Sequence, residues 1–450
     1  MQALRTAIIT GIVIASIFAG AVALSENKKQ KNKAVTGETA KRLPCFLAIS
    51  DVHMDTSKSA TRYLSETGID LWTSAKQKIN KIISTDKPTF IIVLGDLPWH
   101  ANRNDISQLK NARGNTGFVL ENLRGIAVAA KIPLLYVTGN NDSWGGDYDA
   151  FTVDGKTPFM LDVAGQDKWP MINSSSSHGT TAPSIADSSI LQLGCYSAYP
   201  LGRKSHLRVI ALNSVIFVND KVYSGNAVND AGTELGWLKE QLSDAEKLND
   251  MVLIAMHVQP GKSAYLNTLH GGKGFGKNMW DSTLMYKGNT VQDAFLDMAD
   301  QYKTRIIGVL GSHTHMDGVK ILLNRCKQFS NILISVPSIA PDHLNNPGIK
   351  VISYDPSNNY ALMNFTTSYY TFNKDAKDAW ETSYSFDSVF NCAAGTSISA
   401  YIQSAVFDKK DIDGFLKNNR SIYMVKSIMP NDNDMQTATK ADYQKELCTP

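Results

Sequence analysis

Five short polar motifs along the chain carry side chains of the kinds that bind divalent metals. In chain order they are Asp51-Val52-His53, Gly95-Asp96, Gly139-Asn140-Asn141-Asp142, His257 and His313-Thr314-His315. Each follows or ends a short apolar run. Taken singly, an Asp-x-His or His-x-His triplet is weak, because such triplets also occur in solvated turns. Two aspartates, four histidines and an asparagine taken from these five motifs suffice for two adjacent divalent cations that share one carboxylate.

The elements that must position these motifs are strands of a layered α/β domain. Unbroken apolar runs predict strands buried on both faces at 45–50, 90–94, 134–137, 209–213, 252–256, 306–310, 332–336 and 349–354. Helical spacing predicts amphipathic helices at 71–84, 117–130, 232–248 and 291–302. Because strands and helices alternate, we expect one α/β domain over residues 44–355. Ligands of such sheets bind beyond the carboxyl ends of the strands, where the motifs lie.

The N-terminus predicts export. Arg5 precedes an apolar run from Ala7 to Leu24, and Ala21-Val22-Ala23 offers the small-x-small pattern of a cleavage site. We therefore expect a signal peptide over residues 1–23 and a polar linker over 24–43, in a secreted or periplasmic protein. An uncleaved membrane anchor is the alternative, because about 18 apolar residues is the lower limit for spanning a bilayer.

Three further segments lie outside the predicted strands and helices. Residues 356–450 predict a mostly helical C-terminal extension. Residues 143–190 are rich in small polar residues and predict a long surface excursion. The glycine-rich stretch 260–290, which holds His270, predicts a loop over a site.

The charge distribution gives no support for a nucleic-acid partner. The formal net charge is +3, yet residues 1–42 alone carry seven basic and two acidic residues, so the rest of the chain is mildly acidic. Nothing in the sequence indicates an oligomeric state.

The order of the motifs resembles that of the calcineurin-like metallophosphoesterases. Three stretches are similar to the acid sphingomyelinase-like branch: GDLPWH at 95–100, ELGWLKEQL at 234–242 and SIAPDHLNNPGIKVISYD at 338–355. The resemblance covers Pro44 to Asp355. It implies a four-layer α/β/β/α sandwich with a dimetal site at the edge of the sheets.

The resemblance also implies a ligand set and a reaction. It assigns seven metal ligands, with Asp96 bridging: Asp51, His53 and His315 for one ion, and Asn140, His257 and His313 for the other. Zinc is usual in this branch, and manganese or iron would also suit the mixed ligands. A metal-bridging hydroxide would attack phosphorus. We therefore expect a phosphoesterase that acts on small soluble phosphorylated substrates such as nucleotides, polyphosphate or small phosphodiesters.

The chain departs from the family pattern at two positions. Asn141 stands where the family commonly has the histidine that protonates the leaving group, and an amide cannot deliver a proton. His100, which matches the second active-site histidine of the branch, is then the candidate acid. Ser312 replaces a glycine before His-x-His, and we expect Gly311 to absorb the turn. His343 either lines the pocket or packs.

Two other functions stay open at this point. One is a lipid phosphodiesterase of the sphingomyelin type, whose C-terminal extension or 143–190 segment contacts a membrane. Only the leader and linker precede Pro44, so we expect no saposin-type lipid-presenting domain, and this favours soluble substrates. The other is a metal-binding interaction protein that lost turnover together with the missing histidine.

Overall fold

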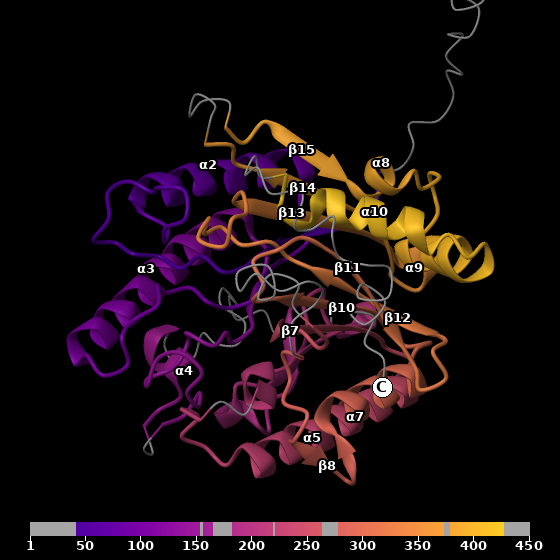
Figure 1. Ribbon diagram of the computed structural model, residues 1–450, viewed down its shortest axis with the longest axis horizontal. Coiled ribbons are helices and arrows are strands. Elements are labelled where there is room, and N and C mark those ends of the chain that lie inside the picture. Colours follow the sequence, from indigo (N-terminus) through magenta and orange to yellow (C-terminus); the bar gives the residue numbers. More distant parts are fainter. Residues whose placement is uncertain are drawn as a thin grey trace, which may run out of the picture. The chain divides into compact units, whose positions relative to one another are not determined.

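The computed structural model describes residues 42–153, 156–164, 182–218, 221–262, 278–372 and 379–426. Figure 1 shows these segments in chain colours. Three predicted parts lie outside the described residues: the signal peptide, all but the last two residues of the linker, and residues 263–277 of the predicted 260–290 loop, which hold His270.

A six-stranded sheet contains the strands that precede the first three motifs. Its order is β15-β14-β13-β1-β2-β3, in which β1, β2 and β3 run parallel and the other three are antiparallel to their neighbours. Because parallel neighbours end at the same edge, the residues that follow β1, β2 and β3 gather there. The bounds of the strands are β1 Cys45–Ile49, β2 Ile91–Val93, β3 Leu134–Tyr136, β13 Gly348–Asp355, β14 Ala361–Tyr369 and β15 Thr382–Ser385.

A seven-stranded sheet contains the strands of the last two motifs. Its order is β11-β12-β10-β7-β6-β5-β4, with the four strands from β12 to β6 parallel and antiparallel strands at both edges. The bounds are β4 Ser184–Asp187, β5 Tyr196–Tyr199, β6 Leu207–Ala211, β7 Met251–Val258, β10 Ile306–Ser312, β11 Gly318–Leu323 and β12 Phe329–Ser335. A small hairpin, β8 (Met285–Tyr286) and β9 (Asn289–Thr290), stands apart.

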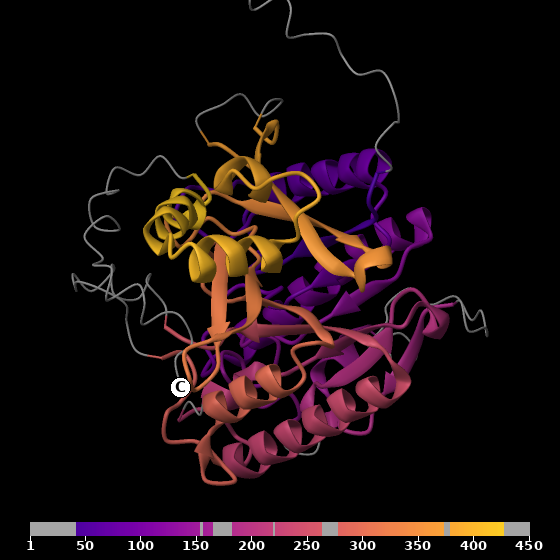
Figure 2. The same cartoon turned by 90° about the vertical axis from the view of Figure 1, so that its right-hand side faces the viewer.

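Alternation along the strands divides the core into layers. On β6, Val209 and Ala211 belong to the apolar cluster shared with the six-stranded sheet, whereas Ile210 belongs to a second cluster under α5 (Ala227–Leu248) and α7 (Val291–Gln301). The first cluster also includes residues of α2 (Ile69–Asp86) and α3 (Ile106–Ala130). Figures 1 and 2 show α5 and α7 on the side of the seven-stranded sheet opposite to α2 and α3. The predicted four-layer α/β/β/α fold is confirmed.

All eight predicted strands and all four predicted helices of the domain form. The largest difference is at α3, which begins at Ile106, well before the predicted start at Gly117. Asp105 caps this helix by accepting from the backbone N–H of Ser107 and Gln108, at 2.9 and 3.3 Å. Its first turns carry mostly polar residues, so the apolar spacing that predicted the helix appears only further along.

The predicted boundary at residue 355 is wrong. Strands β14 and β15 continue the six-stranded sheet beyond it, and β13 pairs with β14 along its whole length, from Gly348 with Tyr369 to Asp355 with Ala361. Leu362 and Phe365 of β14 lie in the main core. Asn364 and the polar residues at 366–368 interrupt the apolar residues of β14, so a search for unbroken apolar runs did not detect this strand.

The helical part of the C-terminal region begins only after β15. It comprises α8 (Phe386–Phe390), α9 (Ile398–Ile402), a π-helical turn (Gln403–Asp408) and α10 (Ile412–Tyr423). Phe386, Ile398 and Phe415 all belong to the core that contains β1. These helices therefore pack as part of the same domain as β1. Figure 2 shows them in yellow beside the strands of the six-stranded sheet.

A buried carboxyl group outside the candidate site makes the stability of the fold depend on pH. Burial raises the pKa of Glu234 on α5 from 4.5 to about 8. The folded chain then holds this proton while the unfolded chain releases it, so stability falls as pH rises from about 5 to about 8. We expect Glu234→Gln to remove this dependence of stability on pH. Relative to wild type, the free energy of unfolding of the variant should be greater at about pH 8 than at about pH 5, by on the order of 2 kcal/mol. Urea unfolding with a chelator present, at both pH values, measures it. An equal effect at both values would contradict the prediction.

Candidate metal centre

The two sheets meet at the edge where the motifs lie. His257 on β7 donates from Nδ1 to the carbonyl of Leu94, which follows β2, at 2.6 Å. The Ser312 hydroxyl, at the end of β10, donates to the same carbonyl at 3.1 Å. Because the Nδ1 proton of His257 is held there, its Nε2 lone pair faces the motifs of the other sheet. Ser312 thus fastens the strand end of one sheet to the other.

Five of the predicted ligands sit in left-handed backbone conformation, which is uncommon for residues other than glycine. Their φ values are 46° for Asp51, 44° for His53, 52° for Asp96, 71° for His313 and 63° for His315. Backbone of this kind is found where the surrounding structure holds a side chain in a required direction. The expectation that Gly311 absorbs the turn is wrong, because Gly311 lies inside β10 and the histidines themselves make the turn.

Asp51 presents a buried oxygen to three imidazoles. Its Oδ1 atom has no hydrogen-bond donor within the described part of the chain. The Nε2 atoms of His315, His257 and His53 lie 3.5, 3.8 and 3.9 Å from it. The Nε2 atoms of His53 and His315 are themselves only 3.2 Å apart. A buried acceptor without a donor, facing lone-pair nitrogens, is the arrangement that a cation would satisfy.

Asp96 lies between the two predicted ligand groups. Its Oδ2 atom is 3.3 Å from Nε2 of His257 and 3.7 Å from Nε2 of His53. The Asn140 Oδ1 atom lies 2.9 Å from the same His257 nitrogen. The ligand atoms of Asp96, His257 and His313 all lie within 4.8 Å of one another. The structure therefore brings all seven predicted ligands together, and these residues could hold two cations.

The buried charges favour a cation at this place. Burial raises the pKa of Asp96, but the charge of His257 outweighs it and holds the pKa well below the usual range. Burial lowers the pKa of His257, but Asp96 and Asp51 raise it to about 10. The carboxylates thus stabilise positive charge at His257 Nε2, and a metal ion can take the place of the proton there.

Asn141 turns toward Asp96. Its backbone N–H donates to Asp96 Oδ1 and its side-chain amide donates to Asp96 Oδ2, each at 2.8 Å. The neighbouring Asp142 accepts from the backbone N–H of Asp96 at 2.7 Å and of Gly139 at 2.8 Å. The structure therefore shows Asn141 holding the central carboxylate, a contact that the spacing of the motif did not predict.

His100 lies at the open side of the cluster. Its side chain is 41% exposed, whereas that of His53 is fully buried. The two rings stack with centroids 4.4 Å apart. Glu66 Oε1 lies 2.7 Å from His100 Nδ1. His100 is thus held beside a predicted ligand while keeping access to solvent.

Four further residues reach the cluster, and of these only His343 was a candidate from the sequence, as a residue that either lines the pocket or packs. Glu66 contacts His100, as above, and the Tyr148 hydroxyl lies 3.0 Å from His313 Nε2. Asp342 and His343 lie against His315. Asp342 and His343 fall in a stretch that resembles the branch, yet only tertiary contacts show that they face the motifs.

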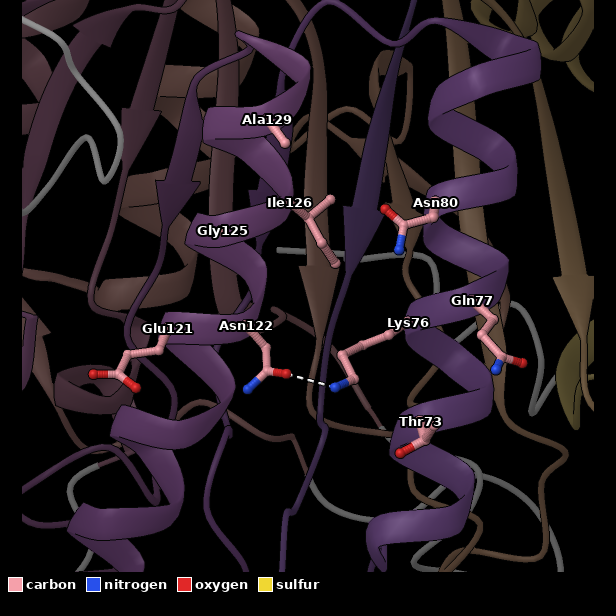
Figure 3. A pocket seen from close by; sticks show the side chains of 9 residues that line it. All are labelled: Thr73, Lys76, Gln77, Asn80, Glu121, Asn122, Gly125, Ile126 and Ala129. Atoms are coloured by element: carbon pink, nitrogen blue, oxygen red, sulfur yellow. Dashed lines mark hydrogen bonds between the residues drawn. The ribbon is translucent and has the colours of Figure 1, made fainter.

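A groove between α2 and α3 lies away from this cluster. Its volume is about 640 Å³, and Figure 3 shows Lys76 donating to Asn122 across it, at 2.6 Å. Its lining offers one carboxylate, that of Glu121, and no histidine. The groove therefore lacks the chemistry of the motif cluster.

Comparisons with known proteins show the family to which the chain belongs. The family model of calcineurin-like phosphoesterases matches residues 46–317. The chain is 21% identical over 350 residues to the cyclic GMP-AMP phosphodiesterase SMPDL3A of Bos taurus, covering 74% of this chain and 68% of that protein. It is 22% identical over 247 residues to sphingomyelin phosphodiesterase 1 of Caenorhabditis elegans, covering 53% of this chain and 39% of that one. A solved dimetal phosphatase from Danio rerio is similar with a TM-score of 0.43 and 13% identity, over 73% of this chain and 96% of that one.

The chain belongs to the calcineurin-like phosphoesterase family. Its relatives support the predicted acid sphingomyelinase-like branch. It is therefore a metal-dependent phosphoester hydrolase, and the fold implies divalent metal ions, for which the motif cluster supplies the ligand types. Within the described residues, no helix is both long and apolar enough to cross a membrane.

Proposed function

We propose that this chain is an exported hydrolase of small soluble phosphodiesters or phosphoanhydrides that works with two divalent cations, most suitably zinc. The observation that supports this most is the position of Asp96, whose Oδ2 lies 3.3 Å from His257 of one predicted ligand group and 3.7 Å from His53 of the other. A carboxylate placed between two such groups is the bridging ligand that a dimetal site needs.

The residues divide the work of such a site. One ion would be held by Asp51, His53 and His315, and the other by Asn140, His257 and His313. Asp96 would bind both ions. When bound, such ions lower the pKa of a coordinated water and neutralise phosphate oxygens. Asn141 fixes the direction of the Asp96 carboxylate through two hydrogen bonds. His100 is the exposed imidazole beside the ligands, placed to give a proton to a leaving oxygen.

Asn141 favours substrates with good leaving groups. Since its amide is committed to Asp96, this position offers no acid, and His100 is the remaining proton donor at the open side. A phosphate leaving group, as in a nucleoside triphosphate or polyphosphate, needs less protonation than the alkoxide released when a phosphodiester is cleaved. Among the soluble substrates, phosphoanhydrides therefore fit this chain best. The activities named for the relatives, on a cyclic dinucleotide and on sphingomyelin, both release an alkoxide, so Asn141 does not separate them.

A panel of substrates tests the function. The purified protein, stripped with a chelator and reloaded with zinc or manganese, is assayed on nucleoside di- and triphosphates, a cyclic dinucleotide, polyphosphate, bis-p-nitrophenyl phosphate and sphingomyelin vesicles. We expect metal-dependent hydrolysis of the soluble substrates. Activity confined to sphingomyelin would overturn the substrate class. Metal binding without any turnover would support an interaction protein instead.

Substrates with different leaving groups test whether His100 donates a proton or only binds the substrate. We expect His100→Gln to slow hydrolysis of alkyl phosphodiesters by about a hundredfold, and that of p-nitrophenyl esters only slightly, because p-nitrophenolate leaves without protonation. His206→Gln is the matched control. His206 is also an exposed histidine whose Nδ1 contacts a buried aspartate, Asp250, at 2.9 Å. Equal losses on both substrate types would show that His100 binds substrate but does not protonate it.

A further inference from the structure

The loop from residue 338 to 346 is fastened to two of the metal-binding motifs through its backbone. The N–H of Ile339 and of Ala340 donate to the carbonyls of Ser50 and Asp51, each at 3.1 Å. The N–H of Ser338 donates to the carbonyl of His315 at 3.3 Å. This loop is therefore held against the strand ends of both sheets.

A buried asparagine fixes the shape of the same loop. The Asn345 side chain is fully buried and donates to the Ser338 hydroxyl at 2.9 Å and to the Ala340 carbonyl at 3.0 Å. These bonds close the loop on itself around Asp342. The carboxylate of Asp342 is thus presented by rigid backbone, which is what a positioning group requires.

Asp342 uses that position to contact a predicted ligand. Its Oδ1 atom lies 2.7 Å from Nδ1 of His315, whose opposite nitrogen, Nε2, is the one that lies 3.5 Å from Asp51 Oδ1. We propose that Asp342 is a positioning residue of the metal centre, which holds His315 through Nδ1 so that Nε2 faces the metal. This inference rests on the proposed function.

The chemistry of the contact supports this role. Both groups lie in a largely water-free environment, since the side chain of His315 is 3% exposed and that of Asp342 is 12% exposed. An ionised carboxylate keeps the proton of His315 on Nδ1 and leaves a lone pair on Nε2. A carboxylate behind a ligand histidine also makes the imidazole a stronger donor to the metal.

His343 makes the second contact to the same carboxylate. Its Nδ1 atom lies 3.1 Å from Asp342 Oδ1, and its ring lies 3.7 Å from that of His315. The side chain of His343 is 24% exposed, against 3% for His315. Asp342 therefore joins a buried predicted ligand to a histidine at the surface of the site. The same carboxylate thus keeps the His343 ring packed against the ring of His315.

The corresponding contact of His53 is looser. Glu66 Oε2 lies 3.8 Å from His53 Nδ1, beyond hydrogen-bond distance, and the other oxygen of Glu66 contacts His100 at 2.7 Å. We therefore expect the affinity for metal to depend on Asp342 more than on Glu66.

Metal affinity is the readout that separates positioning from general stability. Zinc dissociation constants are measured by competition with a chromophoric chelator, and visible absorption is recorded for the cobalt-loaded protein. We expect Asp342→Asn to weaken one of two zinc sites by about 10- to 100-fold and to change the cobalt spectrum. His343→Gln, which leaves the contact between Asp342 and His315 in place, should change the affinity less than threefold.

A second aspartate provides the matched control. Asp187→Asn alters a carboxylate on β4, at the far edge of the seven-stranded sheet, where it accepts from the Trp237 indole at 2.8 Å. It should leave both zinc constants and the cobalt spectrum unchanged. Urea unfolding of each metal-free variant shows whether the fold is retained.

The outcomes are distinct for the two proposals. A wild type that binds two zinc ions, together with an Asp342→Asn variant that binds both as tightly and has the same cobalt spectrum, would overturn the role of Asp342 alone. A wild type that binds no zinc would overturn the dimetal function itself. If Asp342→Asn fails to fold, Asp342→Glu is tested, and wild-type zinc affinity and spectrum in that variant would also count against the proposal.

Discussion

Replacing Asp96 by asparagine is expected to lower kcat/KM by at least about a thousandfold, the largest effect of any single substitution in the site. The exchange keeps the shape of the side chain and removes its charge. Asp96 Oδ2 lies 3.3 Å from His257 Nε2 and 3.7 Å from His53 Nε2, closer to both predicted ligand groups than Asp51 Oδ1, which lies 3.8 and 3.9 Å from the same two nitrogens.

The substitution also places a donor against a donor. Both carboxylate oxygens of Asp96 accept from Asn141 at 2.8 Å, and an amide nitrogen at either position would face an N–H group. The new side chain would therefore be turned or displaced as well as neutral. Metal content after gel filtration should fall below two ions per chain.

The measurement pairs metal analysis with hydrolysis of bis-p-nitrophenyl phosphate. Asp187→Asn again serves as the control, because it removes a carboxylate charge on β4, outside the motif cluster. Full metal content with activity within about tenfold of wild type would show that Asp96 does not bridge two ions.

The sequence predicted the place of the site because the chemistry lies at strand ends. Buried parallel strands are unbroken apolar runs, so β1, β2, β7 and β10 could be located together with the polar residues after them. Strand β14 was missed because Asn364 and the polar residues at 366–368 interrupt its apolar residues.

Contacts made by side chains from distant segments were not predictable in the same way. The side chain of Asn141 faces Asp96 because the loops after β2 and β3 pack together, which places its amide nitrogen 2.8 Å from Asp96 Oδ2. The sequence does not show how these two loops pack. Glu66 and Tyr148 lie in loops with no metal-binding spacing, and only the folded chain brings them to His100 and His313. Residue types and spacing predict ligands, whereas the groups that hold those ligands come from tertiary structure.

The largest expected loss of stability comes from a buried ion pair next to the last motif. Lys350 on β13 is fully buried, and its Nζ atom lies 2.6 Å from Asp317 Oδ1. The other Asp317 oxygen accepts from the hydroxyls of Thr367 and Tyr384, each at 2.7 Å. Asp317 follows His315 by two residues, so this network fastens the His-x-His turn of one sheet to the strands of the other.

We expect Lys350→Met to lower the free energy of unfolding by about 3–5 kcal/mol, because it leaves the Asp317 carboxylate buried without its cation. Urea unfolding measures the change. Lys81→Met is the matched control. Its partner Glu381 is at a similar distance, 2.7 Å, but both side chains are more than half exposed, so the loss there should stay below about 1 kcal/mol.

A double variant separates the buried charge from the lost packing of the lysine chain. In the double variant Lys350→Met/Asp317→Asn, a neutral amide replaces the carboxylate. Its oxygen can still accept a hydrogen bond from the hydroxyl of Thr367 or Tyr384. If the uncompensated charge causes the loss, the double variant should be more stable than Lys350→Met alone. Equal or lower stability would instead assign the loss to packing, including the contact of Lys350 Nζ over the Phe365 ring at 3.5 Å. Because the pair holds the turn that carries His315, the zinc affinity of each variant at Lys350 and Asp317 should fall together with its stability, whereas that of Lys81→Met should not change.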